Sequence, residues 1–217
     1  MKRSVVLLLA MLTAAAGLAA PAKPVSFTWA FVRQTADGGA VAVDASALVS
    51  IKPGDMFKIY IQPDAGTFIY VILQDASNDV QTLFPDSFEL FDAAGYAGTK
   101  YFIPDGNDWF TLDATRGTER VILVASSERL PRLESLLLAN QKTAADKKST
   151  VAAVNAARQA VLDEVKKLAR DHSQLAAAAE KPVTIAGGTR GSIETAAKLA
   201  VHIEAPGFYS RTFRLEH

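Results

Sequence analysis

Histidine is the side chain that most often carries acid–base chemistry near neutral pH, and this chain has three. His202 lies between Val201 and Ile203, where alternation predicts the outward face of a short strand. His172 follows a predicted helix, whose dipole favours an imidazolium there, and His217 is the last residue. None lies in a G-x-S-x-G, H-E-x-x-H, Walker A or EF-hand motif. We expect no catalytic residue and no metal site, although a triad assembled from distant positions stays open.

A glycine-rich loop is the sharpest local signal. The sequence VTIAGGTRG, residues 183–191, predicts a strand that enters a loop before a helix over residues 192–200. Backbone N–H groups in such a loop can hold phosphate or carboxylate, and an arginine adds a charge-assisted contact. The candidate anion-binding residues are Gly187, Gly188, Thr189, Arg190 and Gly191. Ala186 replaces the first glycine of a dinucleotide fingerprint, so no cofactor is predicted and a structural turn is the favoured interpretation.

Acidic residues gather in the stretch from Leu83 to Asp113, where Lys100 is the only lysine. The acids are Asp86, Glu89, Asp92, Asp105, Asp108 and Asp113. Turn residues 105–108 offer oxygen ligands of the kind that calcium takes. Asp, Gly and Asn are also the residues that turns need, so a turn is the favoured interpretation and calcium binding the alternative. Tyr101 and Trp109 can stack on a sugar or a peptide, but strand aromatics more often pack across a sheet.

Composition limits the partners of this chain. Its 217 residues contain 23 Lys+Arg and 23 Asp+Glu, so no strongly basic surface for nucleic acid is expected. Hydrophobic residues make up 49%, which is enough to fill a core. Cysteine is absent, which excludes disulfides, zinc–thiolate sites, cysteine nucleophiles and a lipidated cysteine anchor.

Residues 1–22 have the three parts of a secretory signal peptide. Lys2 and Arg3 supply positive charge, Val5–Leu12 an apolar segment, and Ala20-Pro21-Ala22 a small-residue cleavage site. We expect cleavage after Ala22, with Ala19 as the alternative. An uncleaved membrane helix is a weaker interpretation, because a span needs about 20 firmly apolar residues. The sequence therefore predicts a periplasmic or secreted protein that spans no membrane after cleavage.

Short strands separated by turns follow the signal. Residues 25, 27, 29 and 31 are large and apolar and alternate with smaller residues, which predicts a strand with one buried face. Further strands are expected at residues 41–43, 57–61, 68–73, 80–84, 100–103, 109–112 and 119–125. Pro85 and Pro104 should end two of them, because proline has no N–H to donate to a ladder. Phe84, directly before Pro85, is expected in the core.

Two helices are predicted after the strands. Pro131 fits the first turn of one, with Leu133, Leu136 and Leu137 on one face. Ser149 or Thr150 can cap the other, after a polar connection over residues 141–149. The chain then returns to strands and closes with one over residues 211–216. The fold class is α+β, mainly an antiparallel β-sandwich or partly open barrel with a C-terminal helical segment and a closing strand.

We divide the chain into four segments. They are a signal peptide (1–22), a β-rich sandwich-like domain (23–128), a helical segment (129–181) and a C-terminal strand–loop–helix–strand segment (182–217) that docks on the main domain.

The order of motifs across residues 50–130 resembles bacterial domain of unknown function family 4384. The motifs are Gly54-Asp55, Tyr70-Val71-Ile72, Leu83-Phe84-Pro85, Tyr101-Phe102-Ile103-Pro104, Trp109 to Leu112 and Gly117-Thr118-Glu119. Members are typically exported or appended as extra domains, some to caspase-like peptidases or kinases. The resemblance implies an accessory module and assigns no catalytic residues.

Two functions therefore stand as hypotheses. The first is an exported, non-catalytic accessory or binding module of the bacterial cell envelope, whose partner is an unknown envelope protein or component. The alternative is an exported enzyme or a small-anion-binding protein that uses the Gly187–Gly191 loop. Exposure of that loop, and convergence of His202, Arg190 and an acid on one cleft, would favour the alternative.

Overall fold

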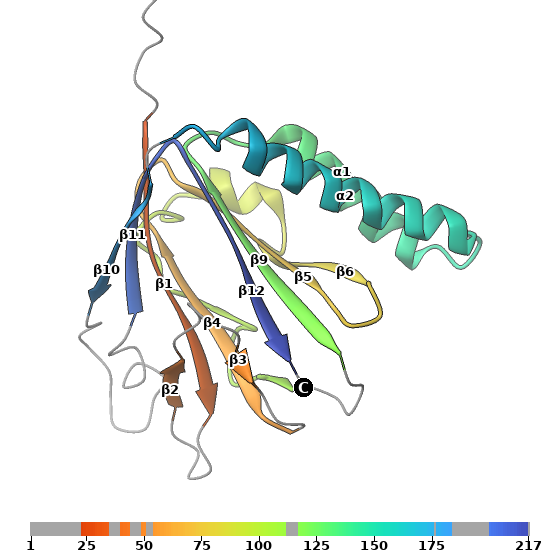
Figure 1. Ribbon diagram of the computed structural model, residues 1–217, viewed down its shortest axis with the longest axis horizontal. Coiled ribbons are helices and arrows are strands. Elements are labelled where there is room, and N and C mark those ends of the chain that lie inside the picture. The colour runs from red at the N-terminus through yellow and green to blue at the C-terminus, as the bar shows by residue number, and fades with distance from the viewer. Residues whose placement is uncertain are drawn as a thin grey trace, which may run out of the picture.

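Two β-sheets and a pair of helices form the fold (Figure 1). The computed structural model describes residues 23–34, 40–43, 49–50, 54–111, 117–175, 177–183 and 200–216. The first sheet runs in the order β10 (Ala179–Val183), β11 (Ala200–Pro206), β1 (Pro24–Gln34), β4 (Met56–Pro63) and β7 (Tyr101–Ile103). Beside this path, β2 (Ala40–Val43) pairs with β1, and β8 (Phe110–Thr111) pairs with β4.

The second sheet lies against the first. Its order is β3 (Val49–Ser50), β12 (Phe208–Glu216), β9 (Thr118–Ser126), β5 (Phe68–Gln74) and β6 (Val80–Phe84). Neighbouring strands are antiparallel in both sheets except β3 and β12, which are parallel. Within the described residues β6 has a strand neighbour only in β5, so the sheet stays open there. The predicted α+β fold with an antiparallel sandwich is confirmed.

The core between the sheets follows from alternation along the strands. Phe27, Trp29 and Phe31 on β1 are at most 5% exposed, as the apolar pattern predicts. Across the gap, the ring of Trp29 lies 4.4 Å from that of Phe213 on β12. Phe84, the last residue of β6, is 4% exposed and precedes Pro85, as expected.

The helices cover the outer face of the second sheet. They are α1 (Pro131–Ala145) and α2 (Val151–Asp171), and they run side by side in Figure 1. Leu133 and Leu137 of α1 and Val161 of α2 are buried in the same apolar cluster as residues of β5 and β9. The side chain of Thr150 caps α2 by accepting a hydrogen bond from the Ala153 N–H. The molecule therefore has three layers, in the order sheet, sheet and helix pair.

Two local predictions differ from the structure. The polar connection predicted over residues 141–149 is shorter, because α1 continues to Ala145 through good helix formers. The helix predicted over residues 192–200 does not include Ala200, which begins β11 and is buried. Residues 192–199 of that prediction lie outside the described residues.

The predicted signal peptide, residues 1–22, also lies outside the described residues. In the part of the chain that the structure describes, no helix has the length and hydropathy needed to cross a bilayer.

Candidate functional site

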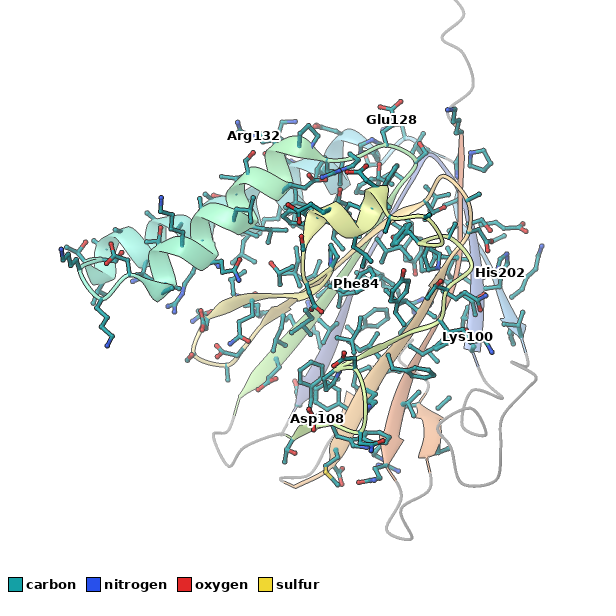
Figure 2. The ribbon with its side chains drawn as sticks, turned by 180° about the vertical axis from the view of Figure 1, so that it is seen from behind. Phe84, Lys100, Asp108, Glu128, Arg132 and His202 are labelled. Atoms are coloured by element: carbon teal, nitrogen blue, oxygen red, sulfur yellow. The ribbon has the colours of Figure 1, made fainter. Side chains whose placement is uncertain are left out.

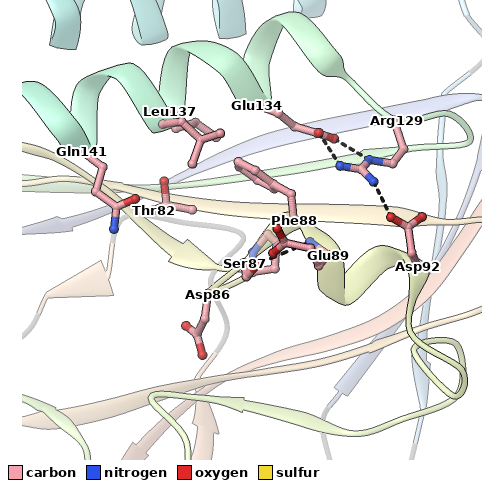
Figure 3. A pocket seen from close by; sticks show the side chains of 12 residues that line it. Thr82, Asp86, Ser87, Phe88, Glu89, Asp92, Arg129, Glu134, Leu137 and Gln141 are labelled. Carbon is pink, nitrogen blue, oxygen red and sulfur yellow. Dashed lines mark hydrogen bonds and ion pairs between the residues drawn. The ribbon is translucent and has the colours of Figure 1, made fainter.

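A hollow of about 500 Å³ lies between the edge strand β6 and helix α1 (Figure 3). Its third wall is the segment after β6, which contains a short 3₁₀ helix, η1 (Phe88–Asp92). The Ser87 side chain begins η1 by accepting a hydrogen bond from the Glu89 N–H. The position of this segment follows from Pro85, which ends β6 and turns the chain toward α1.

The inner wall of the hollow holds a buried carboxylate, Glu134, in the first turn of α1. Arg129 donates to it in bidentate fashion, from Nε to Oε1 at 2.9 Å and from Nη2 to Oε2 at 2.6 Å. The Tyr70 hydroxyl donates to Oε1 at 2.7 Å and accepts the Leu130 N–H at 3.0 Å. Arg129 also reaches Asp92, with Nη1 3.1 Å from Oδ2 (Figure 3). This arrangement links β5, η1 and the start of α1.

Electrostatics hold these groups in fixed protonation states. Burial acts to raise the pKa of Glu134, but hydrogen bonds from Arg129 and Tyr70 outweigh it and hold the pKa below its ordinary value. Burial raises the pKa of Tyr70, and its bond to Glu134 raises it further. The hydrogen bond to Glu134 likewise raises the pKa of Arg129. The cluster is a buried ion pair with a neutral phenol, and none of its groups is set to exchange a proton near neutral pH.

The mouth of the hollow differs from its inner wall. Asp86 and Glu89 are exposed there, and neither carboxylate forms an ion pair among the described residues. A second hollow of about 370 Å³ continues along β6 and shares Thr82 and Gln141 with the first. The two hollows together are called the β6–α1 groove below.

A different polar cluster lies on the outer face of the first sheet. Ser26 Oγ donates to the Asp64 carboxylate and lies 3.3 Å from His202 Nε2. Thr28 Oγ1 lies 3.1 Å from His202 Nδ1, and Glu204 Oε1 lies 3.6 Å from Nε2. Figure 2 shows His202 on the side of the molecule away from the helices. Because the Ser26 proton points to Asp64, His202 is not placed as the base for that hydroxyl.

His172 lies at the end of α2, as predicted. Its ring stacks on Phe208 with the centroids 4.1 Å apart, and its Nδ1 lies 2.8 Å from the Leu168 carbonyl oxygen. These contacts give it a packing role.

The acidic turn predicted around residues 105–108 surrounds a buried lysine that the sequence did not single out. Lys58 is fully buried, and its Nζ donates to the Gly106 carbonyl at 2.6 Å. Burial lowers the pKa of Lys58, while the charges of Asp108 and Asp105 act to raise it. The Lys58 ammonium lies 5.4 Å from the Trp109 ring centroid. In the described part of the chain no three His, Cys, Asp or Glu side chains are placed to hold a metal ion.

Of the other residues singled out in the sequence, Tyr101 is packed, Lys100 is exposed, and the rest lie outside the described residues. Tyr101 packs against Phe84 and Tyr96, with ring centroids 5.0 and 5.9 Å away. Lys100 is exposed (Figure 2). The residues that lie outside the described part of the chain are Gly187, Gly188, Thr189, Arg190, Gly191, Asp113 and His217.

Sequence reasoning named the acids at the mouth of the groove and Leu137, but it did not single out the buried polar residues Glu134 and Tyr70. A signal was present: Glu134 interrupts the leucine face of α1, and Tyr70 is the one hydroxyl in the apolar run of β5. Polar groups on buried faces need partners, so each predicts another buried polar group nearby.

Comparison with known proteins gives one match. Residues 50–129 match the model of a family described as Domain of unknown function (DUF4384), which confirms the resemblance seen in the motifs. No curated protein and no solved structure matches the chain. The matched segment supplies strands β4 to β9, and the strands that flank them in the two sheets, β1 and β12, lie outside it.

Proposed function

We propose that this chain, which carries a DUF4384 domain over residues 50–129, is an exported, non-catalytic accessory or binding module of the bacterial cell envelope. Export is supported by the signal pattern of residues 1–22. The partner is an envelope protein or another envelope component.

One observation carries the binding role. The polar groups best placed for chemistry in the hollow are already paired with one another, since Arg129 and Tyr70 both bind Glu134. A general acid or base needs a pKa near the working pH and a free path to substrate. Here the pKa of Glu134 is lowered and that of Tyr70 is raised, which moves both away from that range. The exposed carboxylates at the mouth are instead available to a bound partner.

The alternative is an exported enzyme or a small-anion-binding protein. The Gly187–Gly191 loop remains its candidate anion site, and that loop lies outside the described residues. The contact of 3.3 Å between Ser26 Oγ and His202 Nε2 is the observation that favours an enzyme. The hydrogen bond from Ser26 to Asp64 weighs against it, because the hydroxyl proton is already committed.

The test of the module function combines three measurements. N-terminal sequencing of the exported protein should find a start near Lys23, and retention of Met1 in a membrane pellet would contradict export. Cross-linking in living cells should give a specific envelope partner. Purified protein should show no turnover of esterase, peptidase, glycosidase or phosphatase substrates. Turnover that disappears in His202→Ala, without any cross-linked partner, would overturn the proposal in favour of an enzyme.

A further inference from the structure

The β6–α1 groove has an excess of negative charge where a partner would enter it. Asp86, Glu89 and Asp92 lie at the wide hollow, and the one cation lining it, Arg129, is bound to Asp92 and to the buried Glu134. At the narrow hollow, Asp79 is paired with Arg158, with Oδ1 2.8 Å from Nη2. The uncompensated charge is therefore concentrated on Asp86 and Glu89, between the end of β6 and the start of η1.

A second observation points to a ligand at the narrow hollow. Asn140 of α1 lines it and is only 4% exposed. Its Nδ2 donates to the Val80 carbonyl of β6 at 2.7 Å, but its buried Oδ1 has no hydrogen-bond partner among the described residues. An unpaired buried amide oxygen costs free energy that a donor from a bound molecule can recover.

The wide hollow also has an apolar patch on its α1 side. Leu138 of α1 is 54% exposed in the wide hollow, and Leu137 lies beside it. The groove thus offers a negatively charged mouth, an apolar patch at Leu137 and Leu138, polar side chains of Thr82 and Gln141 where the two hollows meet, and an unpaired amide oxygen at the far end beside an edge strand. An extended peptide with alternating side chains has this pattern of groups, because neighbouring side chains point to opposite sides at about 3.3 Å per residue.

We propose that the β6–α1 groove binds an extended segment of a partner protein through a lysine or arginine side chain. The cation lies between Asp86 and Glu89, a neighbouring apolar side chain contacts Leu138, and the far end of the segment lies over Asn140, whose side chain turns its Oδ1 toward an N–H donor. This inference rests on the proposed binding function and names its site and the chemistry of its partner.

The probe is a fluorescein-labelled peptide of about ten residues that alternates lysine and valine, a length that spans a strand. Its binding to the full mature chain is followed by fluorescence anisotropy. Wild-type protein should bind it, and a peptide with glutamate in place of lysine should not bind. Raising the salt should weaken binding, because exposed charge pairs are screened.

Two sets of variants locate the binding. Asp86→Asn with Glu89→Gln should weaken affinity about tenfold, while Glu128→Gln with Glu216→Gln, which removes the same charge from exposed sites outside the groove, should change it less than about twofold. Leu138→Lys should weaken affinity because the new lysine repels the lysines of the peptide, and Leu138→Met should leave the affinity unchanged. The side-chain amide signal of Asn140 in NMR spectra should shift when the peptide is added.

Three results would overturn the inference. The first is that the wild-type chain does not bind the peptide. The second is that the two double variants lose the same amount of affinity. The third is that spermidine or Ca²⁺ at matched charge displaces the peptide, which would make the groove a general cation site.

The module function fails separately. If in-cell cross-linking to an envelope partner persists unchanged in Asp86→Asn with Glu89→Gln, the groove is wrong and the module function stands. Turnover without a cross-linked partner would remove the module function itself.

Discussion

Two clusters in this molecule bring together a carboxylate, a hydroxyl and a nitrogen-containing side chain from distant parts of the chain. Under α1, Glu134 lies between Arg129 and Tyr70, and its side chain is 10% exposed. On the outer face of the first sheet, Ser26 contacts both Asp64 and His202, and the His202 side chain is 23% exposed. The chemical groups are alike, but their access to water differs.

The difference in burial decides what each cluster can do. The hydrogen bond between Tyr70 and Glu134 is buried, so solvent can hardly replace it, and it couples the start of α1 to β5, while the Arg129 side chain is 33% exposed. At the sheet surface, water can replace any one partner of His202, so the contacts cost little to lose. We therefore expect the buried cluster to contribute stability and the surface cluster to contribute little.

The largest expected effect comes from Glu134→Ala. Removal of this carboxylate leaves the buried Tyr70 hydroxyl without its acceptor and Arg129 with Asp92 as its remaining ion-pair partner, and we expect a loss of about 2–3 kcal/mol in the free energy of unfolding. Urea denaturation measures it. The control is Glu204→Ala, which removes a solvent-exposed ion pair with Lys181 and should change the free energy of unfolding far less than Glu134→Ala does. Equal losses in the two variants would remove the distinction between buried and surface clusters.

Tyr70→Phe tests the hydroxyl of the same cluster without changing its packing. The variant keeps the ring but leaves Glu134 Oε1 and the Leu130 N–H each short of one hydrogen bond, and should cost about 1–2 kcal/mol. Tyr101→Phe is the control, since its hydroxyl is within reach of water, which can replace its long contact of 3.4 Å with the Tyr96 carbonyl oxygen and its hydrogen bond with the Thr99 side chain. This hydroxyl should contribute less than about 0.5 kcal/mol. If Tyr70→Phe is as mild as this control, the hydroxyl is not part of the buried network.

How far the sequence predicts these features depends on the range of the interactions. Alternation is local, so the strand of Phe27 and Trp29 and the end of β6 at Pro85 follow from neighbouring residues. The pairing of Tyr70 with Glu134 joins positions 64 apart, and nothing local encodes it. The acidic turn of residues 105–108 was interpreted without Lys58, because a lysine at an alternating position in a strand is expected to face solvent. The narrow hollow of the groove depends on another long-range contact, because only tertiary packing brings Asn140 to Val80.

Acid should weaken the buried cluster through the titration of Glu134. Its hydrogen bonds hold the folded pKa of Glu134 below the ordinary value of a glutamate, so its contribution to stability is complete above that ordinary value and is lost as the pH falls through the lower folded pKa. Urea melts taken in steps from neutral pH into acid should therefore show the wild-type chain losing more stability than Glu134→Gln. Parallel curves for the two proteins would mean that Glu134 does not change its proton affinity on folding.

The smallest expected effects belong to the surface cluster. Ser26→Ala and His202→Ala should each change the free energy of unfolding by about 1 kcal/mol or less, because both side chains are within reach of water that can bind the groups left behind. Asp64→Asn completes the set by weakening the acceptor of the Ser26 proton.

The same three variants also decide whether this cluster is structural or catalytic. A structural surface network predicts small stability changes and no change in any hydrolytic turnover. A nucleophile–base pair predicts the opposite: loss of turnover in Ser26→Ala and His202→Ala with stability intact, and altered turnover in Asp64→Asn, because release of the Ser26 proton from Asp64 would let it point to His202 Nε2. Single-turnover assays with activated esters resolve the two outcomes. Only the second would place function on the first sheet instead of in the β6–α1 groove.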